Sequence, residues 1–185
     1  TPLYSSAASD VYKRQIPIYA MPDHIHRLDK LFGYARADRA GDNPDLPKLV
    51  FTAIEGPFEL FGLQVSAFSL PHGQAQSTAY RLGPLGYCTD VSMVPDAVIE
   101  AFRGVKVLVL GALRPEPHPA HLSLAQAVAV AQKIRAAKTY LVHVNHHVGH
   151  VRVEAELPET IHLAYDGLTV ELNSETPTGY KTGQG

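Results

Sequence analysis

The sequence contains no tryptophan and only one cysteine, Cys88, among its 185 residues. A single cysteine excludes an intrachain disulfide framework and fits a reducing compartment, so we expect a cytoplasmic protein. No apolar run approaches the ~20 residues needed to cross a bilayer, so we expect no membrane association. The formal net charge is −2, and the scattered Lys and Arg residues give no basic surface that would track nucleic acid.

Histidine is the unusual residue type in a composition that is otherwise ordinary for a globular domain. Hydrophobic residues make up 45% of the chain and charged residues 18%. The length corresponds to about one domain, since domains have roughly 100 to 200 residues. Eight of the ten histidines lie at or beyond His72, and this skew directs attention to the second half of the chain.

The two ends of the chain differ in character from its middle. The first fifteen residues, TPLYSSAASDVYKRQ, have neither helical nor strand periodicity and resemble translated adapter sequence, so we expect them to be non-native. Residues 16–173 form the predicted domain. The segment 174–185 is rich in Ser, Thr and Gly and is predicted to be a mobile tail.

Hydrophobic periodicity predicts strands in the first half and an α/β alternation in the second. The first half carries a short buried strand at 16–20, a helix at 22–32, an exposed loop at 33–47, and strands within 48–54, 58–70, 78–83 and 85–90. The second half carries helices at 95–102 and 123–137, buried strands at 105–113 and 139–144, and two short strands around an Asp-Gly turn within 161–172. Ser123 is the predicted N-cap of the longer helix.

Four polar side chains fall at or near strand ends, where loops leave a sheet and sites are usually built. They are His72, Asp90, His121 and His143. Imidazole and carboxylate suit zinc, manganese or iron, and one carboxylate can bridge two ions. A lone histidine at a strand end is more often a capped or solvated side chain, so the prediction of a metal site depends on all four converging.

Four stretches resemble the metallo-β-lactamase fold superfamily, in the order expected for that family: LPHGQAQSTAYRLG, YCTDVSMVPDAVIEAFRGVKVLVLGALR, HPAHLSLAQAVAVAQKI and TYLVHVNHHV. The closest branch contains the phosphoribosyl cyclic phosphodiesterase and the tRNA 3′-end-processing ribonuclease. The resemblance covers residues 16–172. It implies an α/β fold, an αββα sandwich, and a hydrolase that uses two divalent ions, zinc or manganese, on a small, cyclic phosphodiester.

The resemblance also implies a role for each of the four residues. His72 corresponds to a ligand of the first metal, Asp90 to the carboxylate shared by both ions, and His143 to a ligand of the second metal. His121 corresponds to a histidine that is not a ligand and acts near the scissile phosphate as a general acid or phosphate partner. An imidazole in that position can protonate a leaving alkoxide.

The family's principal ligand motif, HxHxDH, is expected before residue 16 and is not found in this sequence. We therefore expect an incomplete fold that lacks its N-terminal strands and this loop, in a chain that is the inactive C-terminal portion of a longer hydrolase. Metal binding is expected to be weak or absent. The similar tetrapeptide DHIH, 23–26, lies inside a predicted helix, where i, i+2 spacing separates its two histidines.

Smaller departures from the family pattern concern residues around the site. Gly111 stands where an acidic residue is expected, Val142 where threonine is usual, and His147 where an acid often follows. Loss of an acid at 111 removes a contact that would orient a ligand histidine. Cys88 is expected to be a buried, inert thiol. The other histidines of the second half are expected to be solvated loop residues, with substrate contact as the alternative for His118 and phosphate contact for one of His146, His147 and His150. His162 is expected to be structural or exposed.

Alternative functions stay open at this point. One is a relative of the tRNA 3′-end ribonuclease, although the chain has neither the length nor the basicity of a tRNA-binding arm. The other is a metal-free binding module, against which the retention of all four polar groups argues. A small-molecule phosphodiester is the expected partner. The sequence leaves the oligomeric state open, a homodimer included.

Overall fold

The computed structural model describes residues 15–41, 43 and 46–172. Apart from Gln15, the segments predicted to be non-native and to form a mobile tail lie outside these residues. The chain divides into two units, 1–58 and 59–185, which are treated separately. No helix among the described residues is long and apolar enough to cross a membrane.

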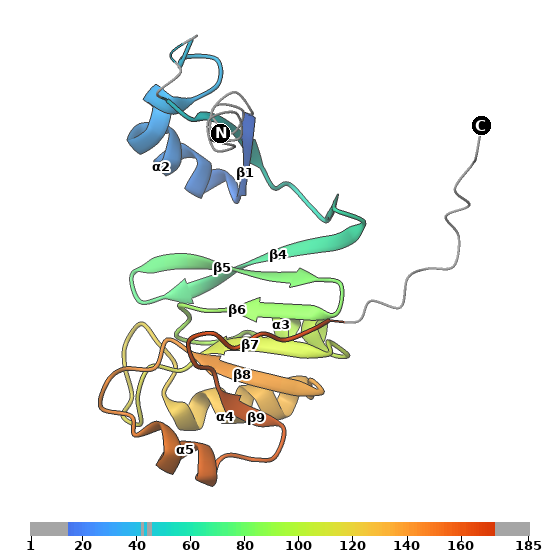
Figure 1. Ribbon diagram of the computed structural model, residues 1–185, viewed down its shortest axis with the longest axis vertical. Helices are drawn as coiled ribbons and strands as arrows, with labels where there is room; N and C mark the ends of the chain where they lie inside the picture. Colours follow the sequence, from blue (N-terminus) through green and yellow to red (C-terminus); the bar gives the residue numbers. More distant parts are fainter. Residues whose placement is uncertain (1–14, 42, 44–45, 173–185) are drawn as a thin grey trace, which may run out of the picture. The chain divides into compact units, whose positions relative to one another are not determined.

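The first unit contains a two-stranded parallel sheet and one helix (Figure 1). Its elements are β1 (Gln15–Ala20), α2 (Pro22–Phe32), the 3-10 helix η1 (Gly33–Ala35) and β2 (Lys48–Ala53). The helix starts with proline and an aspartate in its first turn, as predicted. The prediction that β1 is buried was wrong: only Ala20 is buried in it. Few side chains in the described part of this unit cover β1, since α2 itself has no buried residue.

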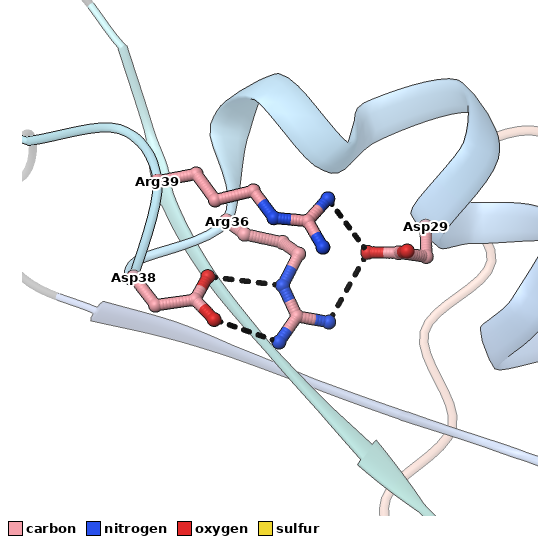
Figure 2. A network of polar contacts seen from close by, with 4 residues as sticks. All are labelled: Asp29, Arg36, Asp38 and Arg39. Atoms are coloured by element: carbon pink, nitrogen blue, oxygen red, sulfur yellow. Dashed lines mark hydrogen bonds and ion pairs between the residues drawn. The ribbon is translucent and has the colours of Figure 1, made fainter.

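Exposed ion pairs hold the loop of the first unit against its helix (Figure 2). Arg36 Nη1 donates to Asp29 Oδ1 at 3.1 Å, and its Nε and Nη2 donate to the two carboxylate oxygens of Asp38 at 3.0 Å each. Arg39 Nη1 lies 3.5 Å from the same Asp29 oxygen. The hydrogen bonds to Asp38 and Asp29 raise the pKa of Arg36, and the bond from Arg36 lowers the pKa of Asp38. Because these groups are accessible to water, the network stabilises the unit only weakly.

The second unit is built on a seven-stranded sheet with the order β3-β4-β5-β6-β7-β8-β9. The strands are β3 (Phe58–Leu60), β4 (Leu63–His72), β5 (Ala75–Leu82), β6 (Leu85–Cys88), β7 (Val107–Gly111), β8 (Lys138–Val142) and β9 (Ile161–Leu163). Strand β5 is antiparallel to β4 and β6, whereas β6 to β9 are parallel. The C-terminal ends of β4, β6, β7 and β8 therefore lie on one edge of the sheet.

Helices α3 (Asp96–Phe102), α4 (Leu124–Ile134) and α5 (His150–Glu156) make the crossovers between the parallel strands. Phe102 from α3 and Ile134 from α4 join Leu108 and Leu141 of the sheet in one hydrophobic core. Ser123 caps α4 as predicted: its hydroxyl accepts from the Gln126 N–H, and the Gln126 side chain accepts from the Ser123 N–H. The α/β class predicted for this part of the chain is confirmed.

Two details of the C-terminal region differ from the prediction. Helix α5 was not predicted, because it has a single buried residue, Val153, and so shows little apolar periodicity. The second strand expected within 161–172 does not form. Instead, the chain after β9 runs back across the sheet (Figure 1). Five of its residues line a cavity of about 310 Å³ together with residues of the sheet; they are Ala164, Tyr165, Leu168, Val170 and Leu172.

Candidate metal centre

All four predicted site residues lie at the same edge of the second unit's sheet. His72 is the last residue of β4, Asp90 follows β6 by two positions, and His143 follows β8 directly. His121 lies in the loop between β7 and α4. The topology therefore brings together side chains that are up to 71 positions apart in the sequence, counted from His72 to His143 (143 − 72).

Backbone hydrogen bonds link the loops that carry these four residues. Each of three bonds links the loop that carries one site residue to the loop that carries another site residue. They are Ser92 N–H to Pro71 O at 2.9 Å, Leu122 N–H to Val91 O at 2.8 Å, and Asn145 N–H to Leu113 O at 2.9 Å. These bonds therefore fix the positions of the loops relative to one another.

Two glycines allow close approaches beside the site. Gly73 turns the β4–β5 hairpin with φ +62°, and a Cβ there would lie 3.1 Å from the Cβ of Ala120. A Cβ on Gly111 would lie 3.3 Å from the Asp90 nitrogen and 3.4 Å from the Thr89 Cα. The glycine at 111, where the family pattern has an acid, thus lets β7 contact the backbone that carries Asp90.

Asp90 and His143 both adopt left-handed backbone conformations, with φ of 53° and 64°. Such values are uncommon for residues other than glycine and cost roughly 1 kcal/mol or more each. Strain of this kind persists only where the surrounding structure imposes it, and it concentrates at functional sites. Its presence at two of the four predicted positions supports a functional role for this edge.

The side chains converge around the Asp90 carboxylate. Its Oδ1 lies 3.6 Å from His143 Nε2 and 3.9 Å from His121 Nδ1. The His121 ring packs between those of His72 and His143, with centroid distances of 4.6 and 4.7 Å. His72, Asp90 and His121 each offer one ligand atom, and these three atoms lie within 4.8 Å of one another.

A backbone carbonyl fixes the tautomer of His72. Its Nδ1 lies 2.7 Å from Ala120 O, and because a carbonyl only accepts, the ring nitrogen donates. The lone pair of the neutral ring is then on Nε2. Metal-binding histidines commonly donate their other N–H in this way.

His121 is more enclosed than Asp90 and His143, with 16% of its side chain exposed against 47% and 46%. Burial, followed by the imidazoles of His143 and His72, lowers the pKa of His121, and Asp90 opposes that shift. His118 also contacts His121, with ring centroids 5.0 Å apart, and its Nδ1 accepts from the Ala120 N–H. The sequence predicted His118 to be a loop residue, and outside a helix its spacing from His121 gives no signal of the contact.

The other residues considered from sequence do not belong to the three-residue group. His146 and His147 pack against each other with centroids 3.9 Å apart. His162 is structural, as expected, and pairs with Glu154 at 2.9 Å. Cys88 is fully buried, and burial raises its pKa to about 12, as expected of an inert thiol. His24 and His26 lie on α2 in the first unit.

The described residues fit one divalent ion better than two. Two imidazoles and a carboxylate with converging ligand atoms are a usual donor set for an ion that keeps an open position. For a second ion, the described residues bring only His143 close to the shared Asp90 oxygen. The donor set is therefore sufficient for one ion and incomplete for a pair.

The C-terminal ends of the parallel strands thus carry imidazoles and a carboxylate that could hold a metal ion in an α/β domain. The chain belongs to the β-lactamase superfamily domain family, whose model matches residues 6–144. The predicted metallo-β-lactamase fold is thereby confirmed, and members of this superfamily are hydrolases.

Two solved structures and one curated protein illustrate this relationship. A diphosphatase of the PhnP family is 33% identical, with a TM-score of 0.76 over 86% of this chain and 60% of that one. Zinc-bound PqqB from Methylobacterium extorquens is 18% identical, with a TM-score of 0.66 over 89% and 68% of the two chains, and shares the fold. An octanoyltransferase of Porphyromonas gingivalis is 26% identical over 159 residues, which are 85% of this chain and 32% of that protein. The chain thus spans only part of the diphosphatase and of the octanoyltransferase.

Proposed function

We propose that the protein to which this chain belongs hydrolyses a small phosphodiester with the help of divalent zinc or manganese. The observation that carries the proposal is the convergence of His72, Asp90, His121 and His143 at one sheet edge of a superfamily hydrolase domain. The 33% identity to a diphosphatase, an enzyme named for action on phosphate, favours phosphorus chemistry. The single cysteine supports a cytoplasmic location.

Each residue has a distinct task in this reaction. His72, Asp90 and His143 would hold the metal, and a divalent ion bound there would supply Lewis-acid polarisation of a phosphoryl oxygen. A water oxygen forms the new bond to phosphorus and loses a proton to solvent while the bond to the leaving oxygen breaks. The imidazolium of His121 gives its proton to that leaving oxygen, and the neutral ring regains a proton from solvent.

The test is turnover of bis-p-nitrophenyl phosphate by two proteins. One is this chain, and the other is a longer chain that includes the residues encoded upstream of residue 16. We expect the longer chain to be active and this chain to be inactive, because the donor set for an ion pair is incomplete here. In the longer chain, His121→Ala should lower kcat by ~10²- to 10⁴-fold, as expected for loss of a general acid.

Matched variants separate this function from its rivals. His26→Ala removes an exposed histidine on α2 and should leave turnover unchanged. Turnover by the longer chain that survives both His72→Ala and His121→Ala would contradict the proposal. Cleavage of precursor tRNA in place of small diesters would instead support the ribonuclease alternative. A longer chain that neither hydrolyses diesters nor binds metal would favour the metal-free binding module.

A further inference from the structure

His118 is an imidazole beside the site that has no task in the proposed reaction. It is half-buried in the loop between β7 and α4, and its ring centroid lies 5.0 Å from that of His121. The His121 ring, in turn, lies 4.6 Å from the His72 ring, and its Nδ1 lies 3.9 Å from Asp90 Oδ1. His118 is therefore one ring removed from two of the groups that are proposed to bind metal.

Hydrogen bonds to a single residue, Ala120, set opposite tautomers in two imidazoles. The Ala120 N–H donates to His118 Nδ1 at 3.2 Å, so that nitrogen carries the lone pair and the proton of the neutral ring is on Nε2. The Ala120 carbonyl accepts from His72 Nδ1 at 2.7 Å, so the lone pair of His72 is on Nε2. The two polar backbone groups of Ala120 thus join a ring outside the proposed reaction to a proposed metal ligand.

The backbone around His118 has little freedom to turn this ring. Pro117 and Pro119 flank it, and a proline fixes its own φ and restricts the residue before it to extended conformations. Ala120 packs against the glycine that turns the β4–β5 hairpin, where an added Cβ would lie 3.1 Å from the Ala120 Cβ. Its N–H is held by a side chain two residues earlier, as in the turns that Asn and Asp side chains form. The segment is thereby closed with the Ala120 carbonyl toward His72.

We propose that His118 is a positioning residue of the site. By accepting from the Ala120 N–H, its Nδ1 holds the loop so that the Ala120 carbonyl keeps His72 in the Nδ1–H tautomer, and the next residue, His121, stays beside Asp90. The roles of His72 as a metal ligand and of His121 as a proton donor stay as in the proposed function, on which this inference rests for its effect on turnover. The tautomers themselves are a property of this chain and are independent of that function.

The first test is the tautomer of each ring in this chain, freed of metal by a chelator and studied by long-range ¹H–¹⁵N NMR. At about pH 8 imidazole side chains are largely neutral, and the two nitrogens of each ring can then be told apart. We expect the proton of His118 on Nε2 and that of His72 on Nδ1. A His118 ring with its proton on Nδ1 would overturn the inference, because that nitrogen could not accept from Ala120. So would a His72 ring with its proton on Nε2 alone.

Substitutions at position 118 test whether this hydrogen bond holds His72. His118→Ala removes the acceptor, so His72 should become a mixture of both tautomers. His118→Asn should keep the single tautomer, because its Oδ1 takes the place of Nδ1. The oxygen of His118→Gln lies one bond farther from the backbone, so this variant should behave like His118→Ala.

The matched control is His146→Ala, which removes an exposed histidine from the loop after β8 and should leave the His72 tautomer unchanged. Circular dichroism shows whether each variant is folded, and where His118→Ala is not, the contrast between the Asn and Gln variants decides. An unchanged His72 tautomer in folded His118→Ala would overturn the inference, as would an equal loss of that tautomer in the Asn and Gln variants.

The second test is turnover by the longer chain. His118→Ala should lower kcat by about 10- to 100-fold, the usual cost of losing a group that orients a metal ligand. Its KM should change by less than about threefold, and His118→Asn should keep kcat within the same factor. A raised KM with unchanged kcat in His118→Ala would overturn the positioning role and indicate substrate contact instead. A longer chain with no turnover would overturn the proposed function alone, because the tautomers are measured on this chain.

Discussion

The two units of the chain are stabilised by different means. In the first, the buried hydrophobic residues are Ala20, Ala35, Ala40 and Ile54, and exposed ion pairs hold a loop to a helix. The second contains one continuous core of fully buried aliphatic and aromatic side chains. Its loops are joined by backbone hydrogen bonds around the candidate site. A site that must hold several side chains within a few ångströms therefore lies on the unit whose core fixes its loops.

The largest expected difference between the units is in the free energy of unfolding, and substitutions at a matched pair of phenylalanines measure it. Phe102 is fully buried and contacts Phe68 edge to face at 5.7 Å, whereas Phe32 at the end of α2 is 40% exposed. We expect Phe102→Ala to lower the free energy of unfolding by ~3–5 kcal/mol, because it removes a large core side chain and leaves a cavity. Phe32→Ala should cost less than ~1 kcal/mol.

Urea unfolding, followed by circular dichroism, measures both changes. Equal effects of the two substitutions would show that the first unit has a core comparable with that of the second. Two separate transitions, of which Phe102→Ala moves only one, would sharpen the comparison by showing that the units unfold independently.

An intermediate effect on stability is expected from substitutions at a matched pair of glycines. Gly111→Ala places a Cβ 3.3 Å from the backbone nitrogen of Asp90, whereas a Cβ on Gly56 meets nothing within 4 Å. We expect Gly111→Ala to destabilise the chain by ~1–3 kcal/mol, as overpacking does. It should also weaken metal binding, because it displaces the loop that carries Asp90.

Gly56→Ala is the control and should change stability by less than ~0.5 kcal/mol. Thermal unfolding and Zn²⁺ titration of both variants test the pair. A Gly111→Ala variant with unchanged metal affinity would mean that the contact between β7 and residues 89–90 does not position the carboxylate.

The smallest expected effect is on the pH dependence of stability, and it concerns Glu154 in helix α5. Burial acts to raise the pKa of Glu154, but hydrogen bonds from the Leu163 N–H and from His162 outweigh it and lower that pKa. A depressed pKa stabilises the fold above the unfolded value of about 4.5, and this stability is lost as pH falls through the folded value. Because the side chain is 35% exposed and screened by water, the contribution should stay under ~1 kcal/mol.

Amide hydrogen exchange at Leu163 between pH 7 and pH 3 reports this bond. Protection should fall on acidification in the unmodified chain and should depend less on pH in Glu154→Gln. Asp29→Asn in the first unit is the matched control, because its partners are Arg36 and Arg39 of that same unit, and the change should not affect exchange at Leu163. Equal pH dependence in Glu154→Gln and the unmodified chain would contradict the assignment.

Much of the second unit could be predicted because local pattern and burial agree there. Continuous apolar runs predicted β7 and β8 as buried strands, and Ser123 with Gln126 indicated the start of α4. The burial of β1 was predicted wrongly, since an apolar run does not reveal whether another layer covers it. Residues 168–172 have strand-like alternation, but they pack over an apolar sheet face instead of pairing.

The site was only partly predictable for a related reason. The predicted strand ends identified His72, Asp90 and His143 as candidates. Because β4, β6 and β8 run in the same direction, these residues lie at the same end of the sheet. Whether His121 reaches Asp90 depends on the path of the loop 112–123 and on hydrogen bonds such as Leu122 to Val91. Such contacts join residues distant in sequence and leave no periodic signal.

The glycine at 111 also couples two parts of the chain that are distant in sequence. A Cβ at this position would lie 3.3 Å from the Asp90 nitrogen and 3.4 Å from the Thr89 Cα. Any larger side chain, including the acidic residue that the resemblance implies, therefore requires the backbone of residues 89–90 to shift. The residue at 111 and the path of the loop after β6 can thus change only together.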